Sequence, residues 1–569
     1  MTVTRPAPPG APLSDRDRAV VYLSVLIALF LAALDQTIVS TALPRMVQDL
    51  SGVDRYAWVA TVYLLASTAL ALVYGKLADT YSRKSVTMGA VSLFLAGSVL
   101  CGVAGELGPL PLLGDGMTQL VIFRGIQGAG GGGLFAMTFI VIADLFTPAE
   151  RGKYQGYVGA VFGIASVLGP LVGGLLTDHA GGLIPGIEGW RWVFWVNVPI
   201  GAVALWFLAR RMPHLEPPGE RVPPDLVGAA LLLGGLVPAI LAIQLDHTAH
   251  PWTSPLTLGL FGAGALLLTG FVLRSRSSAS PILELRLFEN RVFRTANVAT
   301  FFIGASFMSV TIFLPLFLVN VSDVSATSAG AALIPFSLGV VASATLAGQI
   351  VTRVGYRRQI VAGTFLFLAA VVGLATMGAG VPYARITLYM IVAGVGMGPS
   401  MPLFTLAIQN AVDVRYVGQA TSASQFFRQT GATVGAALMG TVLATTLSGA
   451  FASMELPDVL GEGPAVSIEQ LVSTGGAELP ARVEAAYARL AEDADTEARA
   501  EALRLEGARA AERLASEVRA AFTSATSRIY ALTALVTLVA AVLSLRIPEL
   551  PLRTTHDRLV VSREVREAS

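Results

Sequence analysis

Fourteen apolar segments, each long enough to cross a lipid bilayer as a helix, set the strongest limit on what this chain can fold into. Such a helix needs about 20 mostly apolar residues. The segments that meet this condition lie at residues 19–43, 57–75, 86–105, 118–143, 154–177, 191–209, 226–245, 256–273, 294–319, 328–351, 359–379, 384–408, 420–449 and 526–546. Of the 569 residues, 54% are hydrophobic and 14% charged, whereas a single soluble core stops growing at about 250–300 residues. We therefore predict an all-α integral membrane protein with fourteen spans.

The basic residues predict how these spans are oriented. Lys and Arg are concentrated in the loops that follow spans 2, 4, 8 and 10, and they are absent from residues 106–118 and 246–255. Positively charged residues stay on the cytoplasmic side of a membrane. Because the number of spans is even, both termini share one side. We expect a multi-pass protein of the cytoplasmic membrane with a disordered cytoplasmic N-terminus (1–18) and a cytoplasmic tail (547–569).

Two further stretches are expected to lie outside the membrane. Residues 210–225 contain a Pro-rich sequence and are predicted to be a cytoplasmic linker. Residues 450–525 form a long extracytoplasmic loop whose later part is rich in Ala, Glu, Arg and Leu, which are strong helix formers. This loop is either a solvated helical elaboration or an element that caps the protein or docks a partner.

A short repeat suggests that the chain has two related halves. GKLADTYSRK (75–84) follows span 2 and GQIVTRVGYR (348–357) follows span 10, and both begin with Gly and end in basic residues. Two related halves, with the substrate site between them, are typical of secondary transporters. Six spans per half predict an N-terminal bundle (19–209) and a C-terminal bundle (294–546). Spans 7 and 8 remain as an extra two-helix hairpin (226–273).

Asp35 and Arg124 are charged residues that lie within apolar spans of the first half. An ionised side chain at the centre of a membrane helix costs about 2.5–3.5 kcal/mol on insertion scales, and such residues are usually functional. Because burial favours the neutral form of a carboxyl group, Asp35 is a candidate for binding and releasing a proton, and for attracting a cationic substrate when ionised. Alternatively, Asp35 is a structural residue bonded to Thr37 or a neighbouring helix. Arg124 stays protonated and is either part of a proton relay or bonded to backbone carbonyls.

Six segments together resemble the major facilitator superfamily, and within it the fourteen-helix family of drug:proton antiporters. These segments are AALDQTIVSTALP (32–44), the span 2 and loop sequence 57–84, LVIFRGIQGAGGG (120–132), GAVFGIASVLGPLVGG (159–174), WRWVFWVNVPIG (190–201) and FFRQTGATVGAA (426–437). The resemblance implies two six-helix bundles with an inserted two-helix hairpin, and transport by alternating access.

The resemblance also implies roles for particular residues. The expected proton-coupling residues are Asp35 and Arg124. The expected cytoplasmic gate consists of Gly75, Asp79, Arg83, Asp144 and Arg151. The expected hinge of the antiporter motif consists of Gly159, Gly163, Gly169, Pro170, Gly173 and Gly174. The expected substrate cavity includes Thr37, Tyr63, Gln127, Asn320, Gln425, Phe427 and Arg428. Two positions depart from the family pattern, because Ser82 stands where a second Gly is usual and Val319 where Gln is common.

Several other functions are not expected from the sequence. The stretch GAGGGG (128–133) matches a dinucleotide fingerprint, but that fingerprint needs a preceding strand, whereas small residues inside a span indicate close helix packing. HTAH (247–250) is not expected to bind a metal, and the single Cys101 excludes an internal disulfide. With no Walker A pattern and no recognisable catalytic triad, we expect neither an ATP-driven pump nor an enzyme, and no cofactor, metal or nucleic acid partner.

The sequence therefore predicts a proton-driven exporter of amphipathic, cationic or lipophilic small molecules in a lipid bilayer. An alternative is the export of a native lipid, siderophore or other metabolite with the help of an extracytoplasmic accessory protein. A channel or receptor built on the same helices is the alternative from another functional class.

Overall fold

Helices make up every secondary-structure element of the described part of the chain. The computed structural model describes residues 14–553 with the exception of 51–54, 107, 110, 112, 183, 185–186, 214–222, 246–249, 323, 325–330, 379, 453, 455–477, 493 and 495. Fourteen helical segments in these ranges are long and apolar enough to cross a membrane, which confirms the predicted fold class. The predicted disordered N-terminus, linker, tail and HTAH stretch lie wholly or mostly outside the described residues.

The helices of the N-terminal half and the pair that follows have these bounds: α1 (Asp15–Leu50), α2 (Tyr56–Thr80), α3 (Arg83–Gly102), α4 (Gly116–Leu145), α5 (Pro148–His179), α6 (Trp192–Trp195), α7 (Asn197–Arg211), α8 (Leu226–Gln244) and α9 (Pro255–Ser277). Those of the C-terminal half are α10 (Arg291–Val321), α12 (Ile334–Val354), α13 (Tyr356–Ala375), α14 (Tyr383–Met397), α15 (Ser400–Ala411), α16 (Val417–Ala452), α18 (Glu478–Glu492) and α19 (Glu497–Leu545). Short 3₁₀ turns precede α6, α10 and α16.

Several helices begin where the sequence supplies a capping group. The Asp115 carboxylate accepts a hydrogen bond from the Thr118 N–H at the start of α4, and Asn290 does the same for Phe293 at the start of α10. At α5, Thr147 and Glu150 form a capping box. Side chains that accept from the free N–H groups of the first turn define where a helix starts.

The helices form two halves that contact each other crosswise. Within the first half α1 packs on α5 and α7, and α4 packs on α2 and α3; within the second half α10 packs on α16 and α19, and α13 packs on α14 and α19. Between the halves, α2 contacts α16 and α5 contacts α12. The second helix of each half therefore meets the fifth helix of the other, as expected for two related halves.

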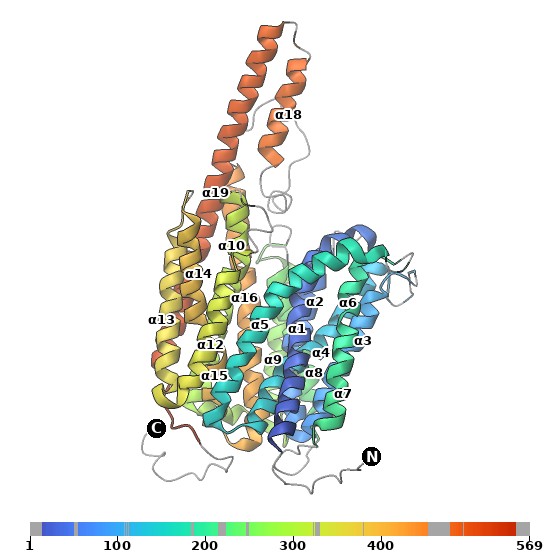
Figure 1. Ribbon diagram of the computed structural model, residues 1–569, viewed down its shortest axis with the longest axis vertical. Coiled ribbons are helices and arrows are strands. Elements are labelled where there is room, and N and C mark those ends of the chain that lie inside the picture. The colour runs from blue at the N-terminus through green and yellow to red at the C-terminus, as the bar shows by residue number, and fades with distance from the viewer. Residues whose placement is uncertain are drawn as a thin grey trace.

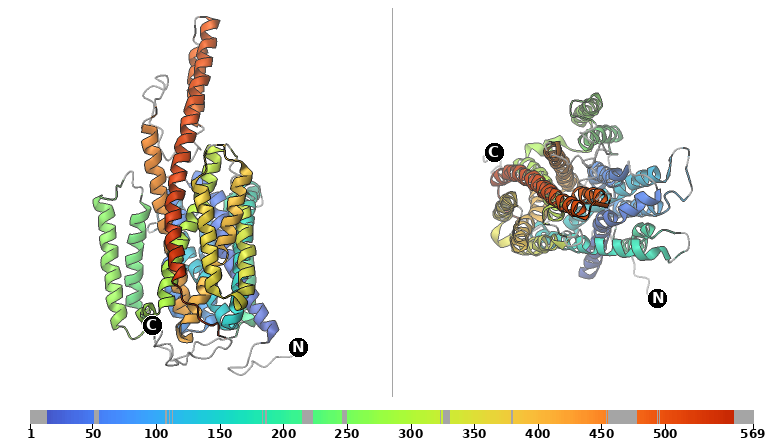
Figure 2. Two further views of the ribbon diagram at one scale, coloured as in Figure 1. Left: turned by 90° about the vertical axis from the view of Figure 1, so that its left-hand side faces the viewer. Right: turned by 90° about the horizontal axis from the view of Figure 1, so that it is seen from above.

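Helices α8 and α9 form a pair at the edge of the molecule. They pack mainly on each other, and α8 also contacts α2 and α16. Figure 2 shows the pair standing beside the remaining helices in both views. The carboxylate of Asp225 accepts a hydrogen bond from Arg274 Nε at 2.9 Å, which joins the two ends of the pair. These helices therefore add to the two halves without separating them.

Helix α19 extends well beyond the other helices. It has 49 residues, which corresponds to about 70 Å at 1.5 Å per residue, more than twice the roughly 30 Å of a bilayer core. Figure 1 shows its first part protruding at the end opposite to the start of α1, with α18 beside it. Val483 and Tyr487 of α18 pack there against Ala510 and Leu514 of α19. The predicted helix-rich loop thus contains a helical hairpin with a small core of its own.

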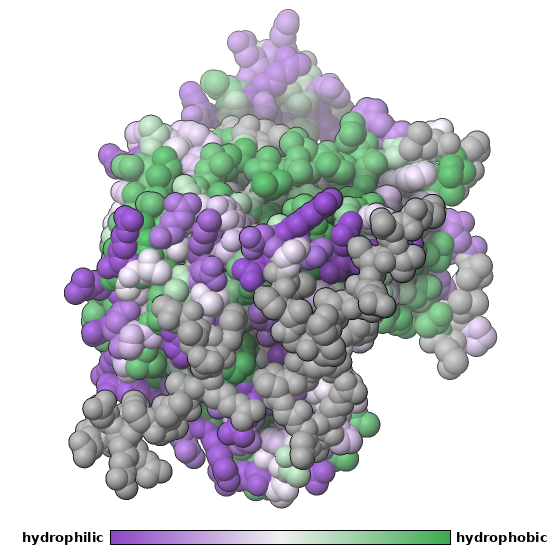
Figure 3. Space-filling model, turned by 60° about the horizontal axis from the view of Figure 1, so that its bottom comes forward, coloured by the Kyte–Doolittle hydropathy of each residue, from purple (hydrophilic) through white to green (hydrophobic). Residues whose placement is uncertain are grey.

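The surface of the molecule changes from apolar to polar along its length. Large apolar side chains are exposed along the spans, with Leu226, Leu266 and Leu535 at 75%, 73% and 61%. Figure 3 shows hydrophobic side chains on the flank and hydrophilic ones on the end near the start of α1 and the end of α19. An apolar belt next to a polar end is what a lipid-facing surface requires.

Glycines let α5 approach two different helices. A Cβ atom built on Gly163 would lie 2.5 Å from Val341 Cγ2 of α12, and one built on Gly169 would collide with the Thr37 hydroxyl of α1. Thr37 Oγ1 also donates a hydrogen bond to the Ala165 carbonyl at 3.0 Å. In the predicted antiporter motif, Gly159 and Gly163 therefore face the other half, whereas Gly169 and Gly173 face α1.

Adjacent glycines in α5 provide a matched test of this packing. A Cβ atom on Gly173 would lie 2.7 Å from the Ile38 carbonyl and would also collide with the Thr41 hydroxyl, whereas nothing lies within 4 Å of one on Gly174. Because overpacking typically costs about 1–3 kcal/mol, we expect Gly173→Ala to lower the free energy of unfolding by that amount. Gly174→Ala should leave it unchanged. Thermal unfolding of the two purified variants measures the difference, and equal stability would contradict the packing described for α5.

Candidate functional site

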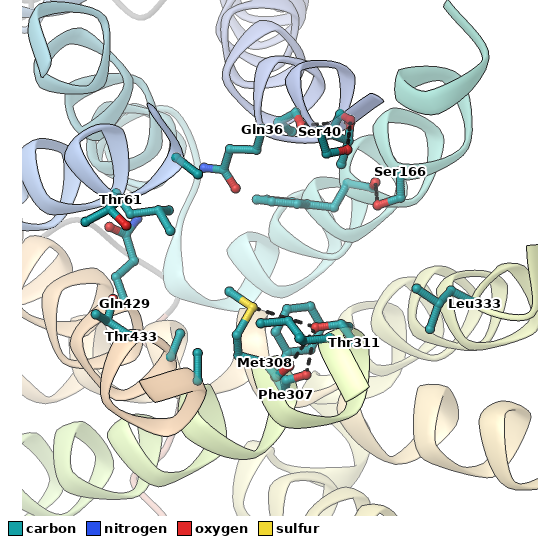
Figure 4. A pocket seen from close by; sticks show the side chains of 18 of the residues that line it. Gln36, Ser40, Thr61, Ser166, Phe307, Met308, Thr311, Leu333, Gln429 and Thr433 are labelled. Atoms are coloured by element: carbon teal, nitrogen blue, oxygen red, sulfur yellow. Dashed lines mark hydrogen bonds between the residues drawn. The ribbon is translucent and has the colours of Figure 1, made fainter. Parts of the chain in front are cut away.

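A central cavity of about 1450 Å³ lies between the two halves. Its walls come from α1, α2 and α5 on one side and from α10, α12 and α16 on the other, with Trp252 near the outer end of the α8–α9 pair. In Figure 4, Gln36, Ser40 and Ser166 face Phe307, Met308 and Thr311 across the cavity. A cavity of this size exceeds the range of about 300–1,000 Å³ that is common for small-molecule sites.

The cavity combines apolar walls with neutral polar groups. Aromatic and methionine side chains contribute large apolar surfaces, namely Phe135, Phe162, Trp252, Phe307, Met308, Phe336 and Met401. Amides and hydroxyls are distributed among them, including Gln36, Thr61, Thr68, Gln429 and Thr433. Among the described residues that line the cavity, Arg428 is the one with a charge. Such a lining suits an amphipathic molecule.

The cavity is closed at the end of the molecule that carries the start of α1. The residues of α5 that line it run from Gly159 to Gly174, whereas Gly152 and Gly156, nearer the start of α5, lie against Gly348 and Ala344 of α12. Toward the opposite end the lining continues to Ala331 and Thr445, to the last residues of α8 and to Trp252. The halves are thus in contact at one end and apart at the other.

Asp35 and Arg124 form an ion pair in the interior of the first half. Asp35 Oδ2 lies 2.6 Å from Arg124 Nη1, and the two side chains are 0% and 2% exposed. Arg124 Nη1 also donates to Gln127 Oε1 at 2.7 Å, and its Nε donates to the Val59 carbonyl at 3.3 Å. The guanidinium lies over the Tyr63 ring, 4.3 Å from its centroid. Arg124 therefore bonds to a backbone carbonyl, as one of its two expected roles requires, and also has a carboxylate partner.

The second carboxylate oxygen of Asp35 is held by amides. Gln127 Nε2 donates to Asp35 Oδ1 at 2.8 Å and Asn197 Nδ2 donates to it at 3.3 Å. The Ser98 hydroxyl accepts from both amides and donates to the Phe194 carbonyl at 2.8 Å. Sequence reasoning missed Ser98 and Asn197, although Asn197 is a polar residue within the quoted span 6 segment. The carboxylate thus has three partners from α4 and α7, and Ser98 of α3 holds the two amides in place.

Asp35 does not line the cavity, whereas its neighbours Gln36 and Thr37 do. Consecutive residues of a helix point about 100° apart, so one side of α1 faces the ion pair and the adjacent side faces the cavity. The expected attraction of a cationic substrate by Asp35 is therefore not seen in this conformation, because the carboxylate is turned toward the interior of the first half.

Of the seven expected cavity residues, Thr37 and Arg428 line the cavity. The other five have different surroundings. Tyr63 and Gln127 lie at the buried ion pair. Gln425 accepts a hydrogen bond from Arg428, Phe427 packs edge-on against Phe288, and Asn320 donates to the Leu316 carbonyl of its own helix.

Asp79 joins the two halves at the closed end. Its Oδ1 accepts from the Gly418 N–H at 2.9 Å, and its Oδ2 accepts from the Gln419 N–H at 2.8 Å. Both N–H groups belong to the first turn of α16, where a helix favours a negative charge. Gly75, one turn earlier, allows close contact, because a Cβ atom there would lie 2.5 Å from Ser422 Oγ. A carboxylate of one half thus caps a helix of the other.

Other expected gate residues surround this contact. Arg83 Nε lies 2.7 Å from Asp144 Oδ2, and Arg83 Nη2 lies 3.6 Å from Asp79 Oδ1. Arg151 instead donates to the Phe146 carbonyl at 3.0 Å and to the Ala143 carbonyl at 2.7 Å. Arg83 therefore connects the two carboxylates, while Arg151 fixes the turn between α4 and α5.

Further contacts at the closed end were not anticipated from the sequence. Gln155 of α5 donates to Gln409 of α15 at 3.0 Å. Glu549, beyond α19, accepts from the N–H groups of Tyr356 and Arg357 at the start of α13. The Arg553 carbonyl accepts from the Ala149 N–H, while its guanidinium donates to the Gln409 carbonyl. The segment after α19 thus also bridges the halves. Its sequence has no motif or hydrophobic periodicity that would have predicted this contact.

Comparison with known proteins agrees with this architecture. Residues 25–436 match the family model described as Major Facilitator Superfamily. The chain is 35% identical over 426 residues to the Bacillus subtilis (strain 168) protein named multidrug transporter protein MdtP, covering 75% of each chain. It is 36% identical over 440 residues to multidrug resistance protein 3 of the same organism, covering 76% of this chain and 82% of the relative.

A solved structure is also similar in fold. The crystal structure of a bacterial homolog to the human lysosomal transporter Spinster, in an inward-facing and occupied conformation, aligns with a TM-score of 0.54 and 16% identity. The alignment covers 95% of this chain and 100% of that one. At this identity the likeness concerns the fold alone.

The Asp79 contact predicts how the closed end responds to a loss of charge. Asparagine has no charge and a single acceptor oxygen, so Asp79→Asn should leave one N–H of α16 without its partner. Because hydrogen bonds to charged groups contribute about 1.5–3 kcal/mol, we expect the population open at this end to rise about tenfold or more. Spin labels at Lys153→Cys and Arg353→Cys, both exposed near the α5–α12 contact, would report it as longer distances. The native Cys101 is buried.

Asp115→Asn is the matched control for this measurement. Asp115 also caps a helix, by accepting from the Thr118 N–H, but its contacts stay within the first half. Its substitution should not change the distance distribution. An unchanged distribution in Asp79→Asn would exclude a role of this carboxylate in holding the halves together.

Proposed function

The chain belongs to the major facilitator superfamily, and from this premise we propose that it exports amphipathic, lipophilic compounds across the cytoplasmic membrane in exchange for protons. As a member of this family it is a multi-pass membrane transporter and not an enzyme. The relatives named as multidrug transporter and multidrug resistance protein support export of varied compounds. The proton motive force supplies the energy in this proposal.

The buried Asp35–Arg124 pair is the observation that carries the proposed coupling. Protonation of Asp35 removes its negative charge and leaves the Arg124 guanidinium with Gln127 and a backbone carbonyl as acceptors. Breaking one side of a buried ion pair typically costs about 3–5 kcal/mol, enough to change the balance between two conformations. Since Asp35 lies on α1 directly beside the cavity-lining Gln36 and Thr37, proton binding and cavity shape are linked through one helix.

The closed end is the cytoplasmic gate in this proposal. Basic residues are concentrated in the loops at that end, as the positive-inside tendency requires, and both the start of α1 and the end of α19 lie there (Figure 1). The conformation described is then outward-facing. The carboxylate of Asp79 at the first turn of α16, together with Arg83 and Asp144, holds this gate closed.

Alternating access follows from the crosswise contacts. The α5–α12 and α2–α16 pairs meet at the closed end through glycines and small residues, so that each pair can separate without leaving large side chains unpacked. Gly169 and Pro170 mark where α5 leaves its contact with α12 and turns toward α1 and the cavity. We assign the hinge to this point, because Pro170 removes a backbone hydrogen bond of the helix.

The protruding hairpin supports a second candidate function, export of a native lipid or other metabolite with an extracytoplasmic accessory protein. Part of α19 and α18 extends past the other helices (Figure 1), and Leu490 and Leu505 are 43% and 52% exposed. Apolar side chains on a helical surface outside the membrane can contact a partner.

Replacement of Asp35 tests the coupling. Asp35→Asn keeps a hydrogen-bonding side chain of the same size but cannot be ionised, so we expect it to lose accumulation of a fluorescent lipophilic probe driven by a pH gradient in proteoliposomes. Exchange of labelled for unlabelled probe at equal pH should persist, because the cavity walls are unchanged.

Asp49→Asn is the control on the same helix. Asp49 lies at the outer end of α1 and accepts hydrogen bonds from Trp190 Nε1 and Arg191 Nη2. This variant should retain uphill transport. Full pH-driven accumulation by Asp35→Asn would disprove proton coupling at this site.

Shortening the hairpin separates the two candidate functions. A Cβ atom on Gly507 would lie 2.5 Å from Tyr487 Cβ, so residues 488–506 can be replaced by a short Gly-Ser turn where the two helices are already adjacent. If the transporter works alone, the shortened protein should transport the probe in proteoliposomes at the rate of the full chain. Loss of transport with retained thermal stability would favour a hairpin that is required for function.

A further inference from the structure

We propose that Arg428 binds an anionic headgroup of the transported compound, so that the preferred substrates are amphipathic acids with a carboxylate or a similar anion. This inference rests on the proposed function, because it assumes that the central cavity holds the exported molecule. It replaces the cationic substrate expected from the sequence with one of opposite charge.

The charge distribution of the cavity is the first observation. Arg428 lines the cavity on α16, and no Asp or Glu is among the described residues that line it. Its guanidinium donates to Gln425 Oε1, a neutral acceptor one turn away on the same helix. Arg428 is partly buried, and a guanidinium that loses part of its hydration is stabilised by a partner of opposite sign. Among the described residues, no carboxylate lies within ion-pair distance of Arg428.

Three buried arginines of the first half show the contrast with Arg428, which is partly exposed on the cavity wall. Arg124 has Asp35 Oδ2 at 2.6 Å, and Arg83 has Asp144 Oδ2 at 2.7 Å. Arg151 has no carboxylate in the described residues within ion-pair distance, but it has two backbone carbonyls and does not face the cavity. Arg428 therefore differs from these three in combining a neutral side-chain partner with a position on the cavity wall.

The position of Arg428 along α16 is the second observation. Lining residues recur on one face of this helix from Arg428 to Thr445, a length of about 25 Å at 1.5 Å per residue. Arg428 is the lining residue of α16 nearest the closed end. Gln429 and Thr433 follow it along the helix toward the open end, and Figure 4 shows both side chains at the cavity. A long amphipathic molecule fits with its headgroup at the closed end.

A space of about 10 Å³ adjoins Arg428, which is room for no more than a water molecule or a single oxygen of the headgroup. This space is also lined by Arg428, together with Ser424 of α16, Thr300 of α10 and Ser400 of α15. The Ser400 hydroxyl is buried without a hydrogen-bond partner in the described protein. Hydroxyl groups and a guanidinium together provide the donors that a carboxylate or phosphate accepts. The apolar walls formed by Phe307, Phe336 and others then surround the hydrophobic part.

Binding of three probes with one fluorescent body tests the proposal. The probes are 11-(dansylamino)undecanoate, its neutral methyl ester, and the corresponding 11-(dansylamino)undecyl trimethylammonium cation, measured by dansyl fluorescence on the full-length purified protein with empty micelles subtracted. We expect the carboxylate to bind about 10- to 100-fold more tightly than the ester, the range for hydrogen bonds to charged groups. The cation should bind more weakly than the ester.

Substitutions at Arg428 assign the preference to this residue. R428Q should reduce the ratio between carboxylate and ester to about one with little change for the ester, and R428K should restore most of it. R415Q removes an arginine that is 62% exposed and pairs with Asp413, so it controls for net charge and should keep the wild-type ratio. Thermal unfolding verifies that each variant is folded.

Two results would overturn the proposal. The first is equal binding of the three probes, or preference for the cation, by the wild-type protein, and this result decides the matter even if R428Q fails to fold. The second is an undiminished carboxylate preference in folded R428Q. Because binding is measured without a pH gradient, a failure of proton coupling in Asp35→Asn leaves this outcome unaffected, and the two proposals are tested separately.

Discussion

A charge inside a membrane protein must have a partner, and this constraint organises the structure described here. Removing an ion from water costs several kcal/mol unless an opposite charge and hydrogen bonds replace its hydration. Asp35 satisfies the constraint with Arg124 and two amides, and Asp79 satisfies it with the first turn of α16. Arg428 satisfies it only in part. The partners of Asp35 and Asp79 connect helices that are distant in sequence, so that a change in charge there becomes a change in helix packing.

The two polar clusters act on different parts of the molecule. The cluster formed by Asp35, Arg124, Gln127 and Asn197 lies within the first half. Gln36 and Thr37, which follow Asp35 in α1, line the cavity instead. The Asp79 cluster lies between the halves at the closed end. In the proposed cycle, a proton changes the first cluster and the transported compound occupies the cavity. Proton binding and substrate binding both act on the contacts between α2 and α16 and between α5 and α12. These contacts must separate for the cavity to open inward.

Much of the architecture could be predicted from sequence because its signals are local. Fourteen apolar stretches predicted fourteen spans, and the repeated turn after spans 2 and 10 suggested the relation between halves. Site residues were harder to predict. Tyr63 and Gln127 were expected at the cavity but lie with Arg124 in the first half. Motif membership identifies a residue as important, but the direction of its side chain depends on how each helix is rotated within the bundle.

By itself, the sequence determined the number of spans, the helical class, the family and the presence of intramembrane charges, because hydrophobicity and motif spacing can be read along the chain. Only the tertiary structure decided which charges pair, which face of α1 meets the cavity, and that Asp79 caps a helix of the other half. It also placed Arg428 in a cavity wall without an acidic residue among those described. These properties depend on the relative rotation and distance of helices separated by hundreds of residues, which no local pattern encodes.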